Sequence, residues 1–143
     1  MNVYSGTLLA NYFTCAEKRG DRAVFLKSRE PRHRFDALFC EPHLDQAFVW
    51  AVTAILSMSD PQLVSFPYMP LRNLPHVPVV IAGEINETFH GVYPVNQPFP
   101  VDKIWLPTEE AMELLFSQVK RDMERYYTCA NPLEVLLERA GKY

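Results

Sequence analysis

Proline is concentrated in one central stretch of the chain. Nine of the 12 prolines lie between Pro61 and Pro107, and each lacks the backbone N–H that the interior of a helix or a β-ladder requires. Long uninterrupted elements are therefore excluded from this stretch. We expect short strands at Leu63–Phe66, Val77–Ala82, Phe89–Val95 and Lys103–Leu106. We expect the third of these to pair with the second, and the fourth to be an edge strand.

The residues before this stretch predict three strands and one helix. β-branched and aromatic residues favour strands at Asn2–Ala10, Arg22–Lys27 and Arg34–Cys40. If the second and third pair as a hairpin, Ser28–His33 is its loop. His43–Met58 follows a proline and stops at a Ser-Asp-Pro sequence, which favours a helix.

The predicted helix at His43–Met58 is apolar on almost every side. Such a helix is typically buried between layers or lies in an interface. We therefore expect Trp50 and Ile55 in the core. Because one core does not necessarily cover a helix that is apolar all round, a homodimer is also compatible with the sequence.

Two further helices are predicted near the C-terminal end. Thr108 with Glu109 and Glu110 begins one that runs to Tyr126. Asn131 is expected to cap the second, with Pro132 at its first position. The inner face expected for this last helix consists of Leu133, Leu136, Leu137 and Ala140.

These elements predict an α+β fold. We expect a single domain spanning residues 1–143, with a largely antiparallel sheet of short strands packed against one buried helix and two C-terminal helices. A chain of this length buries enough surface for one core without cross-links.

Charge and cysteine content narrow the function classes. A net charge of −3 argues against nucleic acid as a partner. Three widely spaced cysteines argue against a disulfide framework. The longest apolar run, Ala47–Leu56, is too short to cross a membrane, and the N-terminus lacks the features of a signal peptide. We expect a cytoplasmic protein with no membrane contact and no cofactor or metal.

The acidic chain contains one basic segment. Seven of its 14 Lys and Arg residues lie between Lys18 and Arg34. Arg29, Arg32, His33 and Arg34 form the densest part, and guanidinium groups suit carboxylate or phosphate. Three interpretations stay open: a solvated loop, a docking site for an acidic protein surface, and a site for a small phosphorylated ligand.

Other residue patterns with chemical potential are weak. Cys40 and His43 have the spacing of two zinc ligands, but a zinc site needs two more, and Cys15 and His33 are placed there only by assumption. Glu84, Glu87 and His90 repeat at intervals of three, yet a hairpin would point the first and last to opposite faces. Asp36 has no second acid fixed near it. Ser5–Thr7 are small enough for a nucleotide to approach, although a strand bend is the commoner reason for such residues.

A proline-fixed apolar loop is the second candidate binding element. Phe66, Tyr68 and Met69 lie among prolines, so the loop has little entropy to lose on binding. It serves either as an interface or as a lid packed on the sheet. Our first hypothesis is a binding module of the inhibitor, immunity or adaptor type that contacts another macromolecule through this loop and the basic one. The alternative is a small enzyme or sequestering protein for a nucleotide or other phosphorylated ligand, with His33 or His90 as acid–base.

Overall fold

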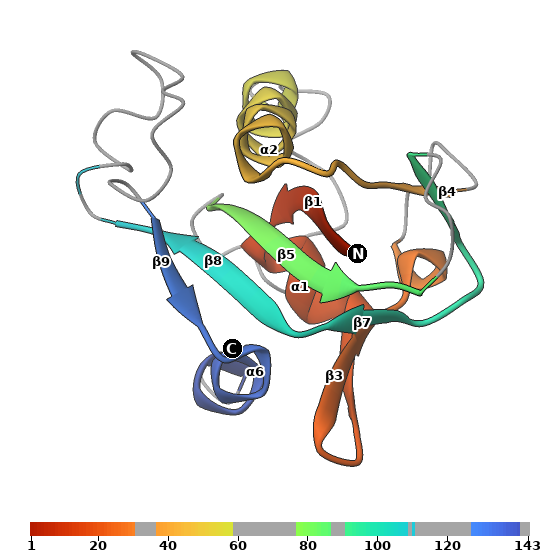
Figure 1. The fold of residues 1–143 in the computed structure, drawn as a ribbon. Helices are drawn as coiled ribbons and strands as arrows, with labels where there is room; N and C mark the ends of the chain where they lie inside the picture. Colours follow the sequence, from red (N-terminus) through yellow and green to blue (C-terminus); the bar gives the residue numbers. More distant parts are fainter. Residues whose placement is uncertain (31–36, 59–76, 87–90, 109, 111–126, 141–143) are drawn as a thin grey trace.

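The computed structural model of this protein describes residues 1–30, 37–58, 77–86, 91–108, 110 and 127–140 (Figure 1). The helices are α1 (Leu9–Cys15), α2 (Leu44–Met58) and α6 (Pro132–Ala140), with a 3-10 turn η1 (Lys27–Arg29). The strands are β1 (Asn2–Leu8), β2 (Ala16–Arg19), β3 (Arg22–Phe25), β4 (Ala37–Phe39), β5 (Pro78–Glu84), β6 (Val92–Pro94), β7 (Phe99–Val101), β8 (Lys103–Pro107) and β9 (Tyr127–Ala130).

The described strands form three sheets. One sheet has the order β1-β5-β8-β9, a second has the order β2-β3-β7, and β4 pairs with β6. Every pairing among them is antiparallel. This confirms the coarse expectation of a mixed fold with helices and antiparallel sheets of short strands.

The segment that contains β7 and β8 connects the first two sheets. Asp102 lies between the two strands, where its backbone N–H donates to the carbonyl of Ala82 and its carboxylate accepts the N–H of Glu84. Gly83 permits this crossing, because a Cβ there would lie 2.0 Å from the carbonyl oxygen of Pro100. The chain therefore passes from its pairing with β3 to its pairing with β5 within one continuous stretch.

The β4–β6 ladder is attached to the free edge of β1. Tyr4 and Glu41 exchange both backbone hydrogen bonds, at 2.8 and 2.6 Å. The Ser5 hydroxyl donates to the carbonyl of Phe39 at 2.8 Å. These bonds fix the segment between β4 and α2 against the first sheet.

Helix α2 covers one face of the first sheet, and α1 and α6 lie on the other side (Figure 1). Gly6 brings α2 close, since a Cβ at this position would lie 1.9 Å from the Ala47 carbonyl oxygen and 2.8 Å from the Ala51 nitrogen. The buried residues of α2 include Ala47, Phe48 and Ala51. The small residues of Ser5–Thr7 thus include one that serves helix packing.

The main hydrophobic core lies on the α1 side of the sheet. It joins alternate residues of β1, β5 and β8 to α1, β3, β7 and α6. Tyr12 is fully buried, and its hydroxyl donates to the Pro132 carbonyl at 3.0 Å. Burial raises the pKa of this phenol well above its usual range, so Tyr12 acts as a neutral link between α1 and α6.

The expectation of one buried helix at 43–58 is wrong in its detail. The helix forms at Leu44–Met58, but Trp50 is 53% exposed instead of in the core. The side chain of Ile55 lies outside the described residues. Among the described helices, α1 is the most buried; its first two residues, Leu9 and Ala10, were predicted as the end of the first strand, and the rest of it was not predicted. Its sequence was ambiguous because it has only seven residues and no side-chain N-cap.

Several predicted pairings are also wrong. β3 pairs with β2 and β7 while β4 pairs with β6, so the described parts of 22–27 and 34–40 form no hairpin. β6 pairs with β4 rather than with β5, and β8 lies between β5 and β9 instead of at an edge. β9 was not predicted. The expectations for 63–66 and for a helix across 108–126 fall outside the described residues, apart from Thr108 and Glu110.

The last helix forms where it was predicted. Asn131 caps it, since its Oδ1 accepts the N–H of Leu133 at 2.9 Å. Its inner face differs from the prediction, because Val135 is buried while Leu137 is 68% exposed. Leu133 and Leu136 pack against the core as expected.

Two glycines allow a paired test of the packing. Gly6→Ala should destabilise the fold by about 3 kcal/mol, because the new methyl group overlaps backbone that cannot rotate away. Gly20 has a φ of 62° in the β2–β3 turn and open space around it. Gly20→Ala should therefore cost only about 1 kcal/mol of conformational strain. Urea denaturation measures both, and an equal or larger loss for Gly20→Ala would contradict the close α2 contact.

The cap supports a second stability prediction. Asn131→Ala should lower the free energy of unfolding by about 1 kcal/mol, because the Leu133 N–H loses its acceptor. Amide exchange across Leu133–Leu137 should accelerate. The exposed Asn86 is the matched control, and equal effects of Asn86→Ala and Asn131→Ala would show that the cap adds nothing.

Candidate functional site

Of the seven residues predicted to bind, the structure describes one. Arg29 lies at the end of η1 and is exposed. The other six fall outside the described residues: Arg32, His33, Arg34, Phe66, Tyr68 and Met69. Their roles stay predictions. The part of the candidate site that the structure describes consists of Arg29 and its neighbours.

Arg29 shares a carboxylate with a second arginine. Its Nη2 lies 2.6 Å from Glu17 Oε2, while Arg19 Nε lies 2.5 Å from Glu17 Oε1. Glu17 and Arg19 come from β2, so the cluster ties η1 to the β2–β3 hairpin. The hydrogen bonds from Arg29 and Arg19 lower the pKa of Glu17. We call these three residues the Glu17 cluster.

A second ion pair lies in the same part of the fold. Lys27 pairs with Glu30 one helical turn further on, and both side chains are largely buried. Burial lowers the pKa of Lys27. This pair fixes η1 within the basic segment, just before its densest part.

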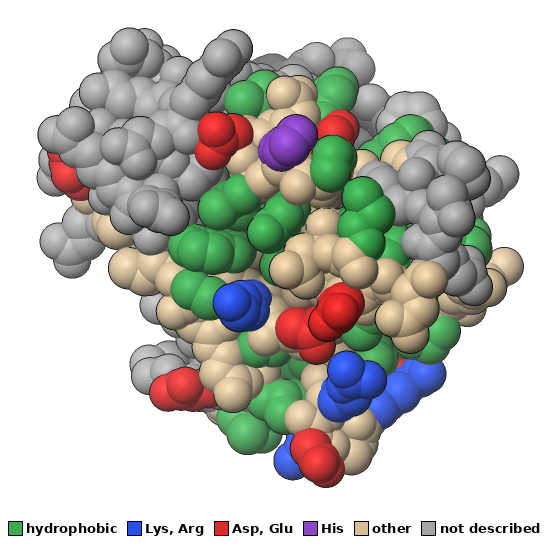
Figure 2. Space-filling model, viewed as in Figure 1, with side chains coloured by type: hydrophobic (Ala, Val, Ile, Leu, Met, Phe, Trp, Pro, Cys, Tyr) green, Lys and Arg blue, Asp and Glu red, His purple; other side chains and the backbone are tan. Residues whose placement is uncertain are grey.

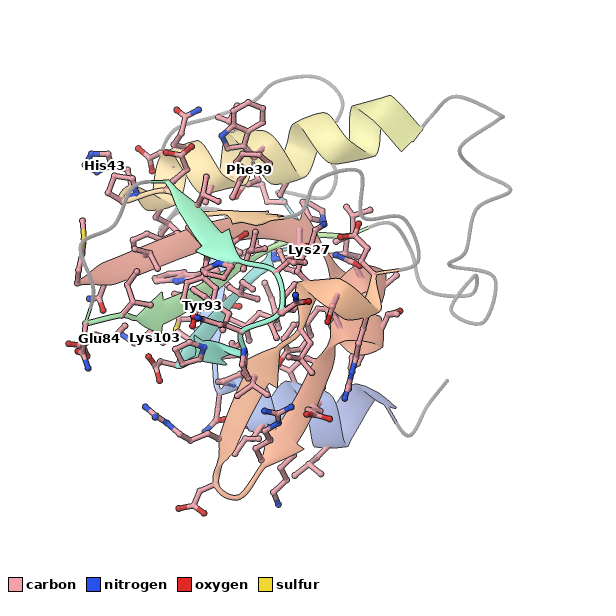
Figure 3. The ribbon with its side chains drawn as sticks, turned by 90° about the vertical axis from the view of Figure 1, so that its right-hand side faces the viewer. Lys27, Phe39, His43, Glu84, Tyr93 and Lys103 are labelled. Carbon is pink, nitrogen blue, oxygen red and sulfur yellow. The ribbon has the colours of Figure 1, made fainter. Side chains whose placement is uncertain are left out.

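Among the described residues, those predicted for metal or acid–base chemistry do not gather. Cys40 is buried and His43 is exposed, so the two do not face a common site. Glu84 is exposed at the end of β5, near Lys103 (Figure 3). Asp36, Glu87 and His90 are outside the described residues. Within the ranges that the structure describes, no three His, Cys, Asp or Glu side chains are placed to hold a metal ion.

Three buried side chains at the junction of β1 and α1 are joined by hydrogen bonds. Asn11 Nδ2 donates to Thr7 Oγ1 at 2.8 Å, and Cys15 Sγ donates to Asn11 Oδ1 at 3.4 Å. Burial raises the pKa of the Cys15 thiol to about 12. This chain of hydrogen bonds therefore has a structural role at the β1–α1 junction.

An exposed aromatic surface was missed by the sequence reasoning. Phe39 and Val92 lie opposite each other in the β4–β6 ladder and are 53% and 50% exposed, while Leu38 is buried. Trp50 is 53% exposed, and its Nε1 donates to Glu41 Oε1 at 3.1 Å. Residues two apart in an extended segment share a side, so Phe39 and Trp50 flank Glu41 on one surface.

We call Phe39, Trp50 and Val92 the aromatic face. Figure 3 shows Phe39 on the side of the molecule that carries β6. Alternate residues of a strand point to opposite faces, so the sequence at 37–39 could have indicated that Phe39 points outward. Its neighbour Val92 could not have been predicted, because the two residues are brought together by a pairing between distant segments.

The space-filling view shows how the surface types are distributed. On the face drawn in Figure 2, apolar side chains gather across the middle and charged side chains occupy the region of the β2–β3 hairpin. That hairpin and η1, residues 16–30, have five basic and three acidic side chains, a net charge of +2. The chain as a whole has a net charge of −3, so this region has the opposite sign.

No protein-family model, curated protein or solved structure matches this chain. In the part of the chain that the structure describes, every helix is too short or too polar to span a membrane.

The three cysteines differ in accessibility, which supports a chemical test. Cys15 and Cys40 are buried with pKa values raised to about 12, whereas Cys129 is exposed on β9. At pH 8 a thiol with such a pKa is about 0.01% thiolate, and only the thiolate reacts. One thiol should therefore react rapidly with a disulfide reagent in the native protein, and three after denaturation.

Cys129→Ser is the control variant for this test. It should remove the fast reaction and leave two slow thiols. Rapid reaction of two or more thiols in the native protein would contradict the burial of Cys15 or Cys40.

Proposed function

We propose that this chain is a protein-binding module that contacts its partner through the aromatic face and the neighbouring basic residues. The observation that carries the proposal is the exposure of Phe39, Trp50 and Val92, each about half accessible. Exposed aromatic residues that lie together are typical of interaction sites and supply most of the energy at interfaces.

The position of the basic residues indicates the chemistry of the partner. β4, β6 and η1 lie on the same side of the molecule, the right-hand side of Figure 1. A partner that covers this side meets apolar side chains from the aromatic face and guanidinium groups from the Glu17 cluster. The surface complementary to both is a protein surface with an apolar centre and acidic residues beside it.

The test compares the aromatic face with another exposed apolar residue. Phe39→Ser/Trp50→Ser should weaken partner binding about 30-fold or more, the loss expected from a binding hot spot. Leu137→Ser on α6 is the matched control, because Leu137 is 68% exposed on a different element. The measurement is capture from source-cell lysate by immobilised protein, followed by native mass spectrometry of the complex and titration with the purified partner.

The expected result is a stoichiometric protein partner that is retained by the wild type and by Leu137→Ser and lost by the double variant. Thermal unfolding of each variant shows whether it is folded. A partner bound equally by all three would contradict the proposal. A nucleotide mass retained by the wild type, with no protein captured, would also contradict it and favour a phosphorylated ligand.

A further inference from the structure

The Glu17 cluster has the geometry of an occupied anion site. One carboxylate lies between two guanidinium groups, and each of its oxygens faces a different arginine. The arginines come from two separate elements, β2 and η1. A carboxylate between two guanidinium groups is a common way in which proteins recognise an acidic side chain.

This internal carboxylate is partly accessible, and both of its arginine partners are exposed. The side chains of Arg19, Arg29 and Glu17 are 50%, 43% and 28% exposed. Exposed ion pairs contribute little to stability because water competes for both charges. An external carboxylate can therefore exchange with Glu17 at small cost.

The surrounding charge favours such an exchange. Lys18 and Arg22 are exposed on the same hairpin as Arg19. The Nη2 atom of Arg22 lies 3.6 Å from the Oδ1 atom of Asp102. Asp21 lies in the turn between β2 and β3. Residues 16–30 still have a net charge of +2, which attracts an acidic segment over roughly a Debye length.

We propose that Arg19 and Arg29 form a binding site for a carboxylate of an acidic peptide segment, and that Glu17 occupies this site as an internal competitor until the segment displaces it. The inference deepens the proposed function, on which it rests, by giving the partner's chemistry at one point of contact. A carboxylate is favoured over a phosphate because the two guanidinium groups are already spaced by a carboxylate.

The experiment uses a fluorescein-labelled hexaglutamate peptide as the probe and anisotropy at low salt as the measurement. Glu17→Gln removes the competitor's charge and should tighten binding about two- to fivefold, the affinity equivalent of an exposed ion pair. Asp21→Asn is the matched control, because it removes one negative charge from the same hairpin. It should change affinity by less than Glu17→Gln does.

A second pair of variants does not depend on Glu17. Arg19→Gln/Arg29→Gln should weaken binding about tenfold or more, since two charge-assisted hydrogen-bond donors are lost. Lys18→Gln/Arg22→Gln removes the same amount of charge, in this case from the β2–β3 hairpin alone, and should weaken binding less. Circular dichroism and thermal unfolding show that each variant is folded.

Three results would overturn the inference. They are equal tightening by Glu17→Gln and Asp21→Asn, equal weakening by the two double variants, and no peptide binding by either the wild type or Glu17→Gln. Displacement of the peptide by inorganic phosphate as readily as by free glutamate peptide would overturn the choice of a carboxylate. Phe39→Ser/Trp50→Ser should leave peptide binding unchanged, so this inference and the proposed function fail separately.

Discussion

The close approach of α2 to β1 determines which residues reach the surface around it. Gly6 lets the helix backbone lie directly against the strand at Ala47 and Ala51. With these two alanines facing the sheet, Phe48 is buried as well, and Trp50 falls on the flank of the helix about 100° from the centre of the buried face. Its indole then meets Glu41, which β1 holds through Tyr4. The exposure of one aromatic side chain thus follows from one glycine.

A second constraint places the basic residues on the same side. The segment 99–107 pairs with β3 before Asp102 and with β5 after it, and Gly83 leaves room for the crossing. The β2–β3 hairpin is therefore attached to the main sheet by backbone hydrogen bonds rather than by side chains alone. Because η1 follows β3 directly, the Glu17 cluster has a fixed position relative to the β4–β6 ladder.

The features that could be predicted from the sequence depend on residues close together in the chain. The helix at 44–58, the strand at 78–84 and the Asn131 cap all have signals within a few residues, and all three form. The strand pairings depend on contacts between distant segments, which composition does not encode, and there the predictions were wrong. Arg29 shows the same limit within the site. Its charge and exposure could be predicted, but its bond to Glu17, 12 residues away, depends on how η1 folds back on β2.

In the proposed complex, the two surfaces would have different physical consequences. The aromatic face would bury apolar area, so its contribution should appear mainly in the dissociation rate and change little with salt. The Glu17 cluster acts through exposed charges, so it affects the association rate and weakens as ionic strength rises. If a partner carboxylate displaces Glu17 as proposed, the charged contact adds less affinity than two unpaired arginines would. It would still discriminate, because a partner without a carboxylate at that point would leave Glu17 in place and gain nothing there.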